Sequence, residues 1–77
     1  MQRYRSLSEL KTGQSCTIKR LCMSGGMRRR LMDIGLIEGT EVTCVGKSPG
    51  GDPSAYLIRG AVIAIREKDG RDVLVAV

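Results

Sequence analysis

One short segment constrains the fold most, because it contains both a helical repeat and a signal that ends the helix. Met27, Leu31 and Ile34 are spaced at i, i+4 and i+7, so they line one face of a helix that runs from the first of them to the last. Gly35 can adopt the left-handed conformation that terminates a helix, and Leu36 can then fold back onto the apolar face. The sequence therefore predicts one short helix with an abrupt end.

A second glycine marks the start of a strand. Residues 37–40 (Ile-Glu-Gly-Thr) are typical of a turn, since Gly39 permits a positive φ, and a strand is expected over residues 40–47. Ser24 is the expected N-cap of the preceding helix.

Alternating apolar and polar residues predict five short strands. In the first of them, Cys16 and Ile18 are expected to point inward, whereas Thr17 and Lys19 point outward. Five short strands with one helix inserted between the first and the second cannot bury their apolar faces as a flat sheet in so short a chain. A mainly β fold, a small and highly curved barrel, is therefore predicted. The strands are expected at residues 14–21, 40–47, 55–59, 61–66 and 72–77.

Glycine and proline place turns between these strands. Residues 48–53 (Ser-Pro-Gly-Gly-Asp-Pro) concentrate strong turn formers and predict a mobile hairpin tip. Gly60 separates two apolar runs without a spacer, which indicates a bend, a bulge or a tight turn. Residues 68–70 are expected to form another turn, and residues 8–11 one helical turn.

These features follow one another in an order typical of a known family. The residues that carry the likeness are Leu7, Leu10 and Gly13, the segment 28–42, then Gly51, Asp52 and Pro53, Arg59 and Gly60, and Ile63, Ala64, Ile65 and Arg66. Over nearly its whole length the chain resembles the small ferrous-iron transport protein A (FeoA) family. The resemblance implies a five-stranded SH3-like barrel and an accessory role in ferrous-iron uptake. It also implies docking on the cytoplasmic side of a membrane ferrous-iron transporter with a GTPase domain (FeoB), and modulation of the activity or assembly of that transporter.

The length and the cysteines indicate one small intracellular domain. Seventy-seven residues allow a single domain over residues 1–77 with a small core. No apolar run approaches the roughly 20 residues that cross a bilayer, and the N-terminus lacks the apolar stretch of a signal peptide. Three cysteines cannot all pair within the chain, so we expect free thiols and a reducing, cytoplasmic location, with Cys16 and Cys44 buried as small hydrophobic residues.

Positive charge is concentrated in the N-terminal part of the chain. The net charge is +5; residues 1–30 carry eight bases and one acid, whereas residues 31–77 carry five bases and seven acids. Such a run is either a solvated surface or a site for an acidic partner or an anionic membrane surface. A basic barrel that binds RNA or another nucleic acid is the alternative function. However, Tyr4 and Tyr56 are the only aromatic residues, too few for a stacking platform, so a protein partner is favoured.

The chain lacks the groups that catalysis or a metal centre would need. It has no histidine, no serine or cysteine in a nucleophile elbow, and no phosphate-binding glycine loop. Its acids are scattered and its cysteines lack Cys-x-x-Cys spacing, so neither a transition-metal site nor a cofactor is expected. We expect a protein that is not an enzyme and is linked to iron indirectly.

The helix carries the predicted partner surface. Arg28, Arg29 and Arg30 are expected in its first turn, where the helix dipole disfavours each cation by about 0.3–1 kcal/mol. Three cations at an unfavourable position suggest a role outside the fold, namely attraction to acidic groups on a partner. The alternative is that Arg29 pairs with Asp33 at i+4 and the other two are only solvated. We predict that Arg28, Arg29, Arg30 and Asp33, with the adjoining strand edge, contact the partner.

The remaining predicted residues serve the fold. Leu31 and Ile34 are assigned to the core by periodicity, and Gly35 and Gly39 to backbone geometry. Exposed strand edges in so short a barrel are also compatible with a homo-oligomer.

Overall fold

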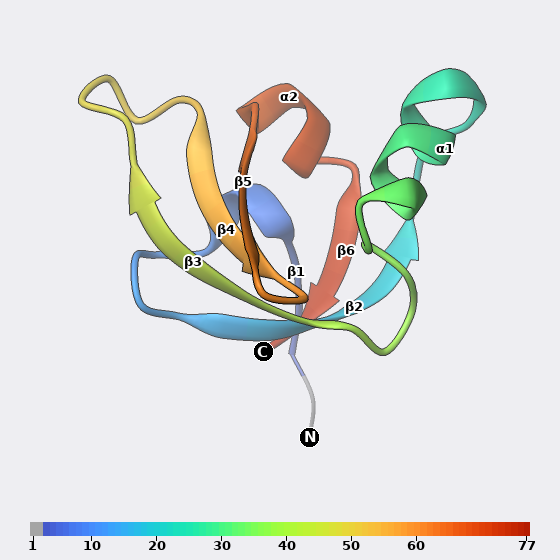
Figure 1. The fold of residues 1–77 in the computed structure, drawn as a ribbon. Helices are drawn as coiled ribbons and strands as arrows, with labels where there is room; N and C mark the ends of the chain where they lie inside the picture. Colours follow the sequence, from blue (N-terminus) through green and yellow to red (C-terminus); the bar gives the residue numbers. More distant parts are fainter. Residues whose placement is uncertain (1–2) are drawn as a thin grey trace.

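The chain folds into one strongly curved antiparallel sheet with short helices at its margin (Figure 1). The computed structural model describes residues 3–77. Within them, the sheet has six strands in the order β1-β6-β2-β3-β4-β5. The elements in chain order are β1 (Tyr4–Ser6), the 3-10 helix η1 (Leu7–Glu9), β2 (Ser15–Leu21), α1 (Gly25–Asp33), β3 (Glu41–Lys47), β4 (Ser54–Ile58), β5 (Ala61–Ile65), α2 (Glu67–Gly70) and β6 (Val73–Ala76).

The mainly β prediction is confirmed, but the predicted number of five strands was wrong. The additional strand is β1, which pairs with the last strand, β6, so that Tyr4 lies opposite Ala76 and Ser6 opposite Leu74. All three residues of β1 are at least partly exposed, so β1 has no apolar alternation to mark it. Its conformation comes from pairing with residues some 70 positions away, a contact that local sequence does not reveal. The pairing brings the two ends of the described chain side by side.

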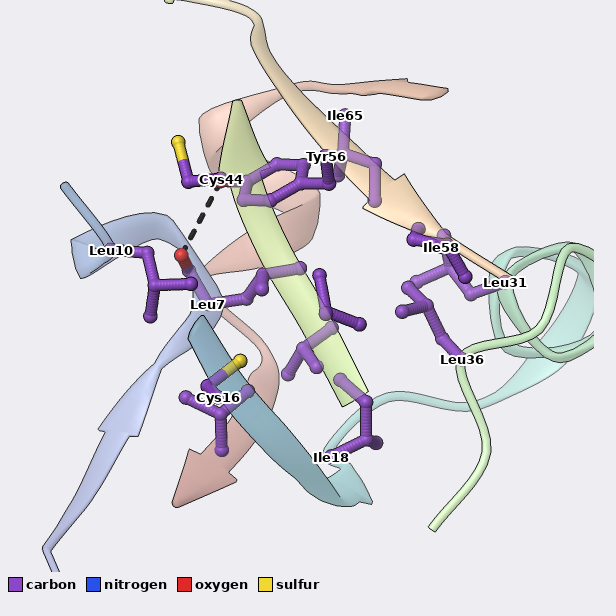
Figure 2. Close-up of a cluster of buried hydrophobic side chains, with 13 residues drawn as sticks. Leu7, Leu10, Cys16, Ile18, Leu31, Leu36, Cys44, Tyr56, Ile58 and Ile65 are labelled. Carbon is purple, nitrogen blue, oxygen red and sulfur yellow. Dashed lines mark hydrogen bonds between the residues drawn. The ribbon is translucent and has the colours of Figure 1, made fainter. Parts of the chain in front are cut away.

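The inward-facing positions of β2 and β3 supply the centre of the core, as the alternation predicted. Cys16, Ile18, Val42 and Cys44 are all buried. The Tyr56 side chain extends through this core, and its hydroxyl donates a hydrogen bond to the Leu7 carbonyl oxygen over 3.3 Å (Figure 2). The fully or almost fully buried apolar cluster comprises Leu7, Leu10, Cys16, Ile18, Leu31, Leu36, Val42, Cys44, Tyr56, Ile58, Ile65, Val73 and Val75.

The two central turns lie where glycine and proline predicted them. Residues 48–53 connect β3 to β4, and the Gly51 amide donates to the Ser48 carbonyl over 2.7 Å. Arg59 and Gly60 alone connect β4 to β5 and have φ values of 49° and 85°. A two-residue turn with two positive φ angles matches the right-handed twist of the strands that it joins.

The region predicted as a turn at residues 68–70 is the end of a short helix, α2. Its first amide, that of Glu67, donates to the Asp52 carboxylate over 2.9 Å. Its last residue, Gly70, packs against the backbone of Ser8. The helix therefore links the 48–53 turn to the η1 region.

The end of α1 is built as predicted, but its start differs. The Leu36 amide donates to the Leu31 carbonyl and the Gly35 amide to the Met32 carbonyl, both over 3.0 Å, while Gly35 has a φ of 110°. This pair of bonds is a Schellman motif, and it buries Leu36 completely. The helix begins at Gly25, directly after the predicted N-cap Ser24 but two residues before Met27, where the apolar repeat starts, since two glycines give no helical signal.

Candidate functional site

The helix α1 projects from one side of the sheet, and little of it is buried (Figure 1). Only Leu31 is fully buried, while Met27 and Ile34 are half-buried against the core. Ser24 occupies the N-cap position with extended backbone, but its side chain makes no capping hydrogen bond. The helix therefore holds to the barrel by a narrow apolar stripe and leaves its other faces open to a partner.

The four predicted partner-binding residues are all exposed, but they do not share one face. Arg28, Arg29 and Asp33 lie with Ser24 around a shallow hollow on the outer side of α1. Arg30 lies on the other side, where α1 faces β5. The structure thus divides the predicted patch between an outer surface and the lining of a groove.

The earlier start of α1 removes one argument for this site. Arg28 is the fourth residue of the helix and Arg30 lies in its last turn, so the arginines are not in the first turn as predicted. In the last turn the dipole favours a cation. The dipole therefore gives no reason to assign these arginines to a partner.

The lack of ion pairs at these arginines gives a better reason to assign them to a partner. The salt bridges described for residues 3–77 are Arg5–Glu9 and Arg71–Glu67, so none joins Arg29 to Asp33. The Arg28 guanidinium donates to the Met32 sulfur over 3.2 Å. No acid within residues 3–77 neutralises the three arginines within 4.0 Å, so their charge is directed to solvent.

A groove of about 250 Å³ runs between α1 and β5. Most of the residues that line it are apolar, and three are charged. The sequence predicted only that an adjoining strand edge would contribute, and it did not single out the strand residues. The lining comprises Met27, Arg30, Leu31 and Ile34 from α1, and Ile63, Ala64, Ile65, Arg66 and Asp69 from the chain around β5 and α2.

Within residues 3–77 the thiols and acids do not gather into a group of three or more that could bind a metal ion. Burial, helped by the nearby negative charge of Glu41, raises the pKa of the Cys16 thiol to about 11, so it is protonated at neutral pH. Cys44 is buried and Cys22 is exposed, and all three thiols are free.

No helix described for residues 3–77 is long and apolar enough to span a bilayer.

A model of the FeoA domain matches residues 5–77, almost the whole chain. The chain belongs to the FeoA domain family. The predicted family is thereby confirmed, and with it a link to ferrous-iron transport.

A curated relative joins the FeoA domain to a transporter. The chain is 33% identical over 67 residues to a protein of Porphyromonas gingivalis named Fe(2+) transport protein A/Fe(2+) transporter FeoB fusion protein. The match covers 87% of this chain but only 8% of the length of the fusion protein.

Two solved FeoA structures share the fold. The solution structure of iron(II) transport protein A from Clostridium thermocellum is 33% identical, with a TM-score of 0.90, and the match covers 94% of this chain and 44% of that one. A zinc complex of FeoA from Stenotrophomonas maltophilia, described as a prokaryotic SH3 domain protein, is 30% identical with a TM-score of 0.82. That match covers 91% of this chain and 87% of the other, and it confirms the SH3-like fold class.

Proposed function

We propose that this FeoA domain is a non-enzymatic accessory module over residues 1–77 that docks on the cytoplasmic side of a FeoB-type ferrous-iron transporter. Docking would modulate the activity or the assembly of the transporter. The observation that carries the proposal is the P. gingivalis relative, in which the two parts form one chain. Fusion gives two modules a high effective concentration for each other, and it is useful only if they act together.

The outer surface of α1 is the docking surface that best fits this role. Arg28 and Arg29 present uncompensated positive charge on a helix that projects from the barrel, with Arg30 on the adjacent face. Charges at the margin of an interface steer a complementary partner and mainly raise the association rate. An acidic patch on the transporter would therefore be captured faster than a neutral one.

The nucleic-acid alternative has less support. Tyr56 is 1% exposed, so it cannot stack on a base, which leaves Tyr4 as the one exposed aromatic side chain. A single ring is not a stacking platform for a single strand.

The test is the binding of the purified chain to the purified FeoB-type transporter of the same organism in detergent. The variant Arg28→Glu/Arg29→Glu/Arg30→Glu should lower the association rate at least tenfold at low salt, and the difference should shrink at high salt. The matched control is Arg3→Glu/Lys11→Glu/Lys47→Glu, which makes the same change of charge at exposed positions away from α1.

The outcomes separate the parts of the proposal. Equal rates for the two triple variants would show that total charge, and not the α1 surface, matters. Failure of the wild-type chain to bind the transporter would overturn docking itself. Thermal melts of both variants should match the wild type, since the replaced side chains are exposed.

A further inference from the structure

Within residues 3–77 the strand β5 ends the sheet, and no described strand pairs with its outer side. It pairs with β4 from Ala61 opposite Ile58 onward, directly after the two-residue turn. The residues that flank such a turn exchange hydrogen bonds with each other, and the direction of bonding then alternates along the strand. The amides and carbonyls of Ala61, Ile63 and Ile65 therefore face β4, whereas those of Val62 and Ala64 face outward.

These outward groups have no backbone partner within residues 3–77. None of the backbone hydrogen bonds described outside the paired strands involves residues 61–65. Natural proteins usually protect such an edge with charged side chains, proline or a covering element. The sequence of β5 is Ala-Val-Ile-Ala-Ile, which contains neither a charge nor a proline. The edge is therefore a ready template for another strand.

The groove beside β5 can receive the side chains of such a strand. Met27 and Ile34 of α1 and Ile63 of β5 line it and are only half-buried. A strand paired with β5 would point alternate side chains into this groove, because side chains alternate between the two faces of a sheet. Those side chains should be apolar.

The opposite face of β5 is apolar as well. Val62 is 64% exposed and lies directly opposite Leu57, which is 40% exposed, while Val45 on β3 is 43% exposed. The remaining side chains of an added strand would cover Val62 and extend this surface. An apolar surface on both sides of an open edge is otherwise costly for solubility.

Charge at the groove selects the kind of partner. Arg30 and Arg66 line it together with one acid, Asp69, and the net charge of the whole chain is +5. Like-charged copies of this chain repel each other, whereas a segment that carries Asp or Glu beside its apolar residues is attracted.

We propose that the free edge of β5 binds an extended, apolar and acidic segment of the transporter as an added strand, with alternate side chains in the groove between β5 and α1. This inference rests on the proposed function and identifies the mode of docking. The backbone of Val62 and Ala64 supplies the hydrogen bonds, the groove supplies side-chain contacts, and Arg30 and Arg66 hold the acidic residues.

The first test replaces one outward amide. Ala64→Pro removes the Ala64 N–H and places a ring on the open edge, while the pairing with β4 does not use this amide. It should raise the Kd for the purified transporter in detergent at least tenfold. Ala64→Val changes the same side chain but keeps the amide, so it is the reference variant, and Ala64→Pro should bind at least tenfold more weakly than Ala64→Val. Equal Kd values for both variants would overturn the proposal.

A second variant covers the case in which proline unfolds the chain. Val62→Glu adds an acid on the exposed face of β5 and should weaken binding of an acidic segment, whereas Val45→Glu, on β3, should not. Hydrogen exchange gives an independent measure: bound transporter should slow deuterium uptake by peptides that cover residues 61–65. Unchanged uptake in a saturated complex would exclude strand addition.

Two further outcomes distinguish a failure of the β5 binding mode from a failure of docking. If the wild type binds the transporter and neither β5 variant changes the Kd, the docking function survives and the β5 mode fails. If Ala64→Pro instead converts a wild-type dimer to a monomer in sedimentation without transporter, the edge serves a second copy and the proposal is overturned.

Discussion

The barrel and the helix α1 use their side chains in opposite ways. Along β2 and β3 the inward positions are completely or almost completely buried, and the buried hydroxyl of Tyr56 has a hydrogen-bond partner. Along α1 one side chain, Leu31, is buried, while three adjacent arginines are exposed and none of the salt bridges described for residues 3–77 involves them. The difference indicates that the barrel provides most of the stability of the fold, and that α1 is attached to the barrel by a narrow apolar contact.

The largest effect that tests this comparison is a cavity in the barrel. Ile18 is fully buried, so Ile18→Ala should lower the free energy of unfolding by about 2–5 kcal/mol. Met27→Ala, on the half-buried stripe of α1, should cost less than about 1 kcal/mol. Urea denaturation of the two variants measures both values. Similar losses would mean that α1 belongs to the cooperative core.

A smaller effect is expected from the one anchor of α1. Leu31→Ala should cost about 2 kcal/mol, near the lower limit for a buried leucine, because a helix attached by one stripe can shift into the space. Amide exchange should accelerate in residues 25–33 more than in β3 and β4. Equal acceleration of amide exchange across the whole chain would mean that α1 does not open independently of the barrel.

Alkaline pH should lower the free energy of unfolding through ionisation of the Cys16 thiol. Burial raises the pKa of this thiol to about 11 in the folded chain, whereas an unfolded cysteine titrates near about 8.5. The protonated thiol therefore favours the folded state, and its contribution is complete below about pH 8.5 and falls as the pH rises toward 11. The loss should reach roughly 3 kcal/mol, because each unit of pKa difference is worth about 1.4 kcal/mol.

Unfolding by urea at several pH values measures this loss. Cys16→Ala should flatten the decline, leaving the part due to Tyr56, whose pKa is also raised by burial. Cys22→Ser, at an exposed thiol, is the control and should decline like the wild type. An unchanged slope in Cys16→Ala would exclude this thiol as the cause.

The smallest effects concern the two glycines after α1, which form a matched pair. Both have a positive φ, 110° for Gly35 and 90° for Gly39, so an alanine at either site is strained by about 1 kcal/mol. Only at Gly35 would the new Cβ also meet neighbours, the Arg59 side chain at 2.9 Å and the Ile58 side chain at 3.1 Å. We expect Gly35→Ala to cost about 2 kcal/mol and Gly39→Ala about 1 kcal/mol in thermal or urea melts. Equal costs would mean that Arg59 and Ile58 adjust freely.

Local patterns predicted the parts of the fold that local physics determines. The alternation around Ile18 and Val42 identified two strands and their buried faces, and Gly35 identified the end of α1. These signals work because side-chain direction repeats regularly and because few residues adopt a positive φ.

The missed features depend on contacts between distant residues. β1 forms by pairing with β6, the β3–β4 register shifts between Cys44 and Gly46, and two glycines open α1. The groove joins Met27 to Ile63, so periodicity could identify each wall but not their proximity. The partner-binding role of the arginines and Asp33 is still a prediction, now without the support of the helix dipole.

The pairing of β1 with β6 has a consequence for how this domain can be combined with others. The Val77 amide donates to the Arg3 carbonyl over 3.0 Å, so the first and last described residues lie next to each other. A loop of another protein could therefore carry the whole barrel as an insertion with little disturbance to the host backbone. For the same reason, a short linker could join the ends and new ends could be opened in the 48–53 turn, giving a circular permutant that leaves both the α1 surface and the β5 edge intact.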